Sequence, residues 1–264
     1  MGRVMPSATS AVLGLAAELR EAGRPVISLG AGEPDFDTPD HIKAAAIQAI
    51  HDGETKYTAI DGTSHLKAAI QRKFERDNQL VYAPEQILVS VGAKHTLFNA
   101  CMAILGPGDE AIIPAPYWVS YPDMVRVADG TPVVIDTGIE DGFKVTPEKL
   151  AAAISDRTRL LFLNSPSNPT GSCYTKDELA ALGEVLLQHP NIVVLADDIY
   201  EHIHWADEPF CSLATACPDL YNQVVTINGV SKCYAMTGWR VGYAGGPPEV
   251  IKAMKTIQSQ ITSN

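Results

Sequence analysis

Short apolar runs alternate with amphipathic stretches along most of this chain. The apolar runs are of strand length and rich in Val, Ile and Leu, and they lie at 86–91, 110–114, 131–135, 159–164, 191–198, 223–228 and 240–245. Several lack polar alternation, which predicts burial on both faces, as in a parallel sheet covered by helices. The pattern therefore predicts an α/β fold, with a mostly parallel sheet flanked by helices.

Residues typical of helix starts and helix ends lie between the apolar runs. Thr38-Pro39, Thr63 and Thr146-Pro147 each place a capping hydroxyl before an amphipathic stretch, which predicts helix N-termini there. The run at 86–91 leads into a helical pattern at 93–105 that stops at Gly106. Before residue 40 the chain offers one helical stretch and an extended segment that begins with a short expected strand, VISL at 26–29.

Composition and charge exclude several classes of protein. The net charge of −11 argues against a nucleic-acid partner and against an anionic membrane surface, because both need a basic face. No apolar stretch approaches the ~18 residues of a membrane-spanning helix, and the N-terminus does not resemble a secretory signal. The five cysteines contain no C-x-x-C pair, which fits a reducing cytoplasm better than a disulfide or zinc scaffold. The histidines show no ligand spacing, so no metal site is expected.

Known nucleotide and hydrolase motifs are missing. Gly30-Ala31-Gly32 starts like a dinucleotide-binding turn, but Asp35 stands where the third glycine belongs. No phosphate-binding G-x-x-x-x-G-K-[ST] loop and no G-x-S-x-G elbow occurs.

Four segments that follow expected strands carry the candidate chemistry, since ligands of such sheets bind at the carboxyl ends of the strands. They are Ser90–Lys94, Asn164–Gly171, Asp197–Tyr200 and Ser231–Arg240. The first segment begins a helix with small residues, and the free backbone N–H groups of a helix N-terminus can bind an anion. The others supply amides, a carboxylate with a phenol, and two cations.

These segments resemble the pyridoxal-phosphate-dependent aspartate aminotransferase family, the class I aminotransferases of fold type I. The resemblance rests on N-P-T-G at 168–171, D-x-x-Y at 197–200 and S-K-x(7)-R at 231–240. P-S-A-T at 6–9 and A-G-E-P-D-F at 31–36 resemble the bacterial aspartate/prephenate subgroup. The resemblance implies the large domain of a fold type I transferase, pyridoxal 5′-phosphate as cofactor, an amino acid and a 2-oxo acid as substrates, and a homodimer with shared active sites.

The resemblance also implies a role for each matching residue. Lys232 would be the Schiff-base lysine and proton shuttle, Asp197 the partner of the pyridine nitrogen, and Tyr200 with Asn168 the partners of the ring's phenolic oxygen. Trp118 would stack on the ring. The phosphate would be held by Gly92, Ala93, Lys94, Ser231, Arg240 and, from the neighbouring subunit, Tyr57. The substrate would meet Gly32, Trp118, Asn168 and Lys94, with Lys94 reaching a distal carboxylate beside Ser7 and Thr9.

The family's pattern also sets the expected domains. Residues 1–40 would contribute to a small domain and 41–264 would form the cofactor-binding large domain, while the C-terminal part of the small domain, with the Arg that binds the substrate α-carboxylate, is absent from this sequence. Gly229 stands where another branch of the family has a phosphate-binding serine.

The expected activity is transfer of an amino group from an L-amino acid, aspartate first, to 2-oxoglutarate, with prephenate and aromatic substrates left open. Two alternatives remain at this stage. One is a β-lyase of the same fold, and the other is a truncated cofactor-binding remnant without turnover.

Overall fold

A single mixed sheet runs through the protein. The computed structural model describes residues 2, 4, 8–30 and 32–263, and within them the strands lie in the order β1-β7-β6-β5-β4-β2-β3. Their bounds are β1 Ile87–Val91, β2 Glu110–Ala115, β3 Thr131–Asp136, β4 Thr158–Asn164, β5 Val193–Asp197, β6 Val224–Gly229 and β7 Val241–Gly245. Each coincides with an apolar run of the sequence, so these seven predicted strands are confirmed.

Strand direction is parallel from β6 through β5, β4 and β2 to β3. β7 is antiparallel to both of its neighbours, β6 and β1, so β1 points the same way as the parallel strands. The expectation of a mostly parallel sheet is confirmed. The carboxyl ends of β1, β4, β5 and β6 consequently meet at one edge.

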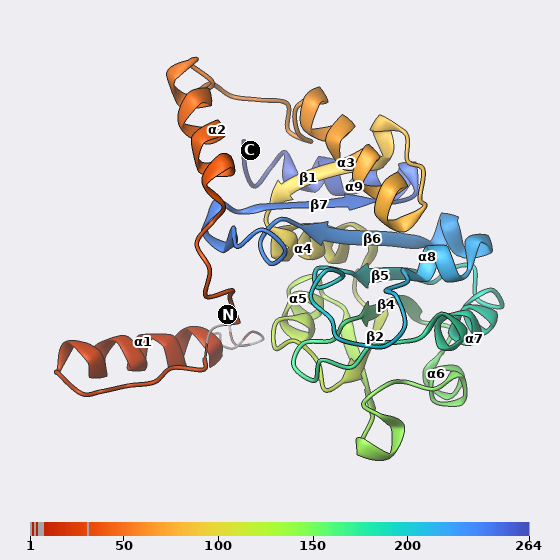
Figure 1. Ribbon diagram of the computed structural model, residues 1–264. Helices are drawn as coiled ribbons and strands as arrows, with labels where there is room; N and C mark the ends of the chain where they lie inside the picture. The colour runs from red at the N-terminus through yellow and green to blue at the C-terminus, as the bar shows by residue number, and fades with distance from the viewer. Residues whose placement is uncertain (1, 3, 5–7, 31, 264) are drawn as a thin grey trace.

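Helices cover both faces of the sheet (Figure 1). α4 (Ala93–Ile104), α5 (Tyr121–Val127) and α9 (Pro248–Gln258) pack on one face, and α3 (Ser64–Asn78), α6 (Pro147–Ala153), α7 (Lys176–Leu186) and α8 (Leu213–Ala216) supply side chains to the core on the other. Short 3₁₀ turns lie at Pro84–Gln86, Ile139–Asp141, Pro218–Gln223 and Thr237–Trp239.

Strand β4 shows why its run has no polar alternation. Leu160 and Phe162 belong to the core cluster beneath α4, α5 and α9, while Leu161 and Leu163 belong to the cluster on the opposite face. Successive side chains of a strand point to opposite faces, so a strand covered on both sides needs apolar residues at every position.

Two of the predicted helix caps are present and one is not. The Thr63 hydroxyl accepts a hydrogen bond from the Leu66 amide, and Thr146 accepts one from Lys149. α2 (Asp40–His51), however, begins after Pro39 with no side-chain cap. The expected cap at Thr38 is therefore wrong, because that hydroxyl is used in a contact far away in the sequence.

The N-terminal segments project from the body of the protein (Figure 1). α1 (Ala8–Glu21) is followed by an extended stretch in which the predicted strand at 26–29 does not form. Ile27 and Leu29 are 93% and 94% exposed. A strand needs a neighbour to complete its hydrogen bonds, and none of the described strands lies beside this stretch, so the prediction is wrong for the chain as it stands.

None of the described helices combines the length and apolar character needed to cross a bilayer. All five cysteines are free thiols, and only Cys101 is buried.

Candidate active site

A cleft of about 680 Å³ opens at the edge where the parallel strands end. Its lining includes most of the residues that the sequence singles out: Gly32, Ala93, Lys94, Trp118, Asn168, Asp197, Tyr200, Ser231, Lys232 and Arg240, together with Thr9. Gly92 and Tyr57 are not among the lining residues. Pro6, Ser7 and Ala31, also singled out by the sequence motifs, lie outside the described residues.

Asp197 ends strand β5 and is 5% exposed. Its Oδ2 accepts a hydrogen bond of 2.6 Å from the Tyr121 hydroxyl, while its Oδ1 is buried with no hydrogen-bond partner among the described residues. Burial raises the pKa of this carboxyl to about 6, against the opposing effects of the Tyr121 hydroxyl, the Ile199 backbone amide and the Lys232 amine. A buried acceptor without a donor is costly, so the site suits a ligand that brings a cationic N–H group to Oδ1.

Asn168 and Tyr200 meet on the same side of the cleft, where the Asn168 amide nitrogen lies 3.4 Å from the Tyr200 hydroxyl. Asn164, the last residue of β4, holds both neighbouring segments. Its Oδ1 accepts from the backbone N–H of Asn168 at 2.8 Å, and its Nδ2 donates to the backbone carbonyl of Asp197 at 2.7 Å. Burial, with the nearby Asp197 charge, raises the pKa of Tyr200.

Lys232 reaches the cleft from the loop between β6 and β7. Its Nζ donates a hydrogen bond to the Gly32 carbonyl and lies 5.7 Å from the centre of the Tyr200 ring. Burial lowers the pKa of this amine and Arg240 lowers it further, while Glu33 and Asp197 oppose the shift. A lowered pKa increases the neutral fraction of the amine, which is the form that acts as nucleophile or base.

The first turn of α4 and the Arg240 guanidinium form a pocket for an anion. Ala93 and Lys94 line it with the backbone of a helix N-terminus, and Arg240 approaches from the opposite loop. A helix N-terminus with an arginine suits a phosphate group. The Gly92 amide already donates to the Ser90 carbonyl at 2.8 Å. Gly92 instead provides space, because a Cβ there would overlap Arg240.

Trp118 lies beside the cationic part of the cleft. The Lys94 Nζ is 4.9 Å from its ring centre, and Tyr121 packs edge-on against the same indole with centroids 5.5 Å apart. Burial, and secondarily Arg240, lower the pKa of Lys94. The indole thus stands between a cation and the phenol that holds Asp197.

Tyr57 does not join these residues in the chain described here. It is 87% exposed and follows α2, whose residues are all at least partly exposed. The expectation that it serves a neighbouring subunit stays a prediction.

The sequence did not single out two residues that build the site, Tyr121 and Gly242. It placed Asn164 in a candidate segment but assigned it no role. Tyr121 had an available signal, since it follows Trp118 within one short segment. Gly242 had no such signal. A Cβ there would overlap the backbone of Gly92 and Ala93, so only glycine lets β7 pass the anion pocket.

The close approach at Gly242 gives a testable prediction. Gly242→Ala should push the first turn of α4 outward, destabilise the fold by about 2–3 kcal/mol through overpacking, and weaken phosphate-bearing ligands. Gly238→Ala is the matched control, because a Cβ at Gly238 meets nothing within 4 Å. Thermal unfolding of both variants checks this. Equal stability of the two would contradict it.

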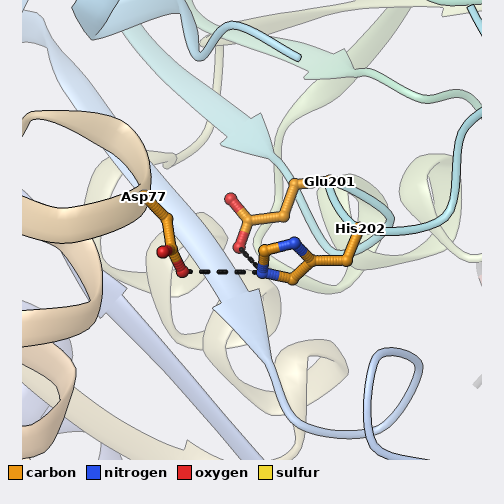
Figure 2. A group of neighbouring side chains, drawn as sticks. All are labelled: Asp77, Glu201 and His202. Carbon is orange, nitrogen blue, oxygen red and sulfur yellow. Dashed lines mark ion pairs between the residues drawn. The ribbon is translucent and has the colours of Figure 1, made fainter. Parts of the chain in front are cut away.

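A carboxylate–histidine group also lies outside the cleft (Figure 2). Asp77, Glu201 and His202 gather there, with the His202 Nε2 3.5 Å from Asp77 and 3.2 Å from Glu201. This grouping was not predicted from the sequence. Lys73 pairs with Glu201 and Arg76 with Asp77, so both carboxylates already have cationic partners. The arrangement favours an ion-pair cluster over a metal centre.

Known proteins of similar sequence are aminotransferases. Residues 24–264 match the family model "Aminotransferase class I and II". The chain is 61% identical over its full length to an aspartate/prephenate aminotransferase of Cereibacter sphaeroides, and 58% identical over 94% of its length to an aspartate aminotransferase of Rhizobium meliloti. It spans 66% and 60% of those two relatives.

Solved structures agree. The aspartate aminotransferase of Rhizobium meliloti superposes with a TM-score of 0.95 at 54% identity, covering 99% of this chain and 66% of that one. The aspartate aminotransferase of Thermus thermophilus with maleate gives a TM-score of 0.94 at 48% identity, covering 99% of this chain and 67% of that one. By its matched residues and its fold, this chain belongs to the class I and II aminotransferase family.

Proposed function

We propose that the chain forms the cofactor-binding part of an aminotransferase that moves the amino group of an L-amino acid, aspartate first, to 2-oxoglutarate. The observation that carries the proposal is the buried Asp197 Oδ1, which lacks a donor and lies in the same cleft as the Lys232 amine. Pyridoxal 5′-phosphate fits this arrangement. Its ring nitrogen would donate to Asp197 Oδ1, and its phosphate would lie against the first turn of α4, Ser231 and Arg240.

When bound, the cofactor supplies an electron sink for the negative charge that develops at the substrate α-carbon. The protein provides the rest. Asp197 would keep a proton on the ring nitrogen, Tyr200 and Asn168 would donate hydrogen bonds to the ring's phenolic oxygen, and Trp118 would stack on the ring. Lys232 moves the substrate's α-proton, and its lowered pKa supports that role because the amine is more often neutral.

A dicarboxylic substrate fits the cationic side of the cleft. Lys94 projects there next to Trp118, and Thr9 lines the same space. The name of the Cereibacter relative and the maleate in the Thermus structure support a dicarboxylate for this chain as well. Gly32 would meet the α-carboxylate through its backbone. Prephenate shares the two carboxylates and fits the same proposal.

The domain arrangement and the partner are part of the proposal. Residues 41–264 would be the large domain and residues 1–40 part of a small domain that further chain completes, which explains why Ile27 and Leu29 stand exposed. A homodimer would bring Tyr57 to the neighbouring anion pocket, and the exposed Ile47 and Ile50 of α2 support such a contact. Five free thiols support a cytoplasmic location.

Half-reactions test the activity. The purified chain loaded with pyridoxal phosphate should convert it to pyridoxamine phosphate when aspartate is added, with release of oxaloacetate, and 2-oxoglutarate should reverse the change. Pyruvate released from a cysteine conjugate without an oxo acid would instead indicate a β-lyase. Bound cofactor unchanged by any amino acid would indicate a remnant without turnover.

A further inference from the structure

Residues 32–38 form a strap that lies along the loop carrying Lys232 and Arg240. At one end of this strap, the Gly32 carbonyl accepts from the Lys232 Nζ, and Glu33 accepts a hydrogen bond of 2.9 Å from the Thr237 hydroxyl. Thr38 makes the contact at the other end. The strap and the loop are about two hundred residues apart in sequence, so this contact is purely tertiary.

The Thr38 hydroxyl is bonded twice to the loop. It donates to the Ala235 carbonyl at 2.6 Å and accepts from the Trp239 indole nitrogen at 3.0 Å. A hydroxyl offers one donor and acceptor lone pairs, so both of its functions are used on one loop. Serine preserves this chemistry, whereas valine preserves the shape and loses both bonds.

The loop needs an external support because its backbone is unfavourable in two places. Ala235 has a φ of 51° and Arg240 a φ of 59°, both in the left-handed region without being glycine. Such residues persist only where the surrounding structure holds them. Thr38 bonds the carbonyl of the first and the side chain next to the second.

We propose that Thr38 is a positioning residue for the active-site loop. By clamping Ala235 and Trp239 it keeps the Lys232 amine and the Arg240 guanidinium directed into one cleft. The two ends of the strap act differently, since the Gly32 contact must open when Lys232 reacts, while the Thr38 contact does not involve a reacting group. This inference rests on the proposed function for its catalytic meaning, but its structural part is testable without cofactor.

Hydrogen–deuterium exchange on the cofactor-free chain provides that test. In Thr38→Val, amides of residues 231–241 should exchange about tenfold faster than in wild type, because two hydrogen bonds are lost. Amides of α7 should not change. Thr38→Ser should match wild type. Trp239→Phe removes only the indole donor and should give a smaller increase, about threefold, which keeps the test informative if Thr38→Val does not fold.

Cofactor titration separates positioning from plain stability. Thr38→Val should bind pyridoxal phosphate about tenfold more weakly, and Thr38→Ser should bind like wild type. Equal exchange in the valine and serine variants would overturn the proposal, and so would faster exchange with unchanged cofactor affinity. Failure of the wild-type chain itself to bind pyridoxal phosphate would instead refute the proposed function. The exchange rates alone would then test whether Thr38 holds the loop.

Discussion

Asp197→Asn is expected to make the cofactor-free protein more stable at neutral pH while it removes most of the activity. In the folded state burial raises the pKa of Asp197 from 3.8 to about 6. The folded protein therefore binds more protons than the unfolded chain between these two values. Its free energy of unfolding falls as the pH rises through this window, and asparagine does not titrate.

The expected stability difference follows from the size of the shift. At about 1.4 kcal/mol per pH unit, the variant should gain up to about 3 kcal/mol over wild type above pH 6, and almost nothing below pH 4. The Tyr121 hydroxyl can still donate to the amide oxygen at position 197. Asp219→Asn, the same change at an exposed position, is the matched control. Denaturant unfolding at pH 4 and pH 8 checks this.

The same substitution should lower turnover by about a thousandfold, because an amide cannot pair with a protonated ring nitrogen and breaking a buried charge pair costs about 3–5 kcal/mol. Greater stability with lower activity is the expected sign of a residue kept for function. A variant that is no more stable than wild type at pH 8 would contradict the cost assigned to the buried charge of this carboxylate. An active variant would contradict its role at the cofactor.

Gln258→Leu is expected to cost about 4 kcal/mol of stability, a large effect for a change away from the cleft. Gln258 lies at the end of α9, fully buried, and all of its hydrogen-bonding capacity is used. Its Oε1 accepts from Ser90 and Asn99, and its Nε2 donates to the carbonyls of Ile60 and Val89. Leucine removes the hydrogen-bond partner of the buried Ser90 hydroxyl, Asn99 amide and Val89 carbonyl, which is worse than losing the bonds alone.

The effect should reach the active site as well. Through Ser90 and Asn99, Gln258 ties α9 to the end of β1 and to α4, which together build the anion pocket. Gln260→Leu, two residues on and exposed, should change stability by no more than about 0.5 kcal/mol. Thermal unfolding of the two variants measures this difference. Similar melting temperatures would show that the hydrogen bonds of the buried Gln258 amide do not stabilise the fold.

Most of the sheet was predictable because strands such as β4 are covered on both faces, which favours apolar residues along the strand and makes the run visible in the sequence. Residues 26–29 look similar, yet form no strand, because pairing depends on a neighbour that the local pattern does not encode. The long-range hydrogen bonds of Gln258 and Thr38 could not be predicted from the sequence. A glutamine at the end of an amphipathic helix and a threonine before a proline have ordinary local explanations, and only tertiary contacts give them their partners.

The candidate site was predictable to the extent that it follows strand ends. Asp197, Lys232 and Arg240 carry recognisable spacings, and the structure gathers them around one cleft. The residues that support them are different in kind. Tyr121 and Asn164 act through hydrogen bonds to Asp197, and Gly242 acts by having no side chain. Neither a supporting hydrogen bond nor the absence of a side chain produces a recognisable sequence motif.

The central claim is that Lys232 holds pyridoxal phosphate in this cleft, and borohydride reduction tests it most directly. The purified chain is incubated with pyridoxal phosphate, reduced, digested and mapped by mass spectrometry, with Lys232→Ala as control. A pyridoxyl group is expected on the peptide that contains Lys232 and on no other lysine. Labelling spread over surface lysines, or a Lys232 peptide that stays unmodified, would contradict it.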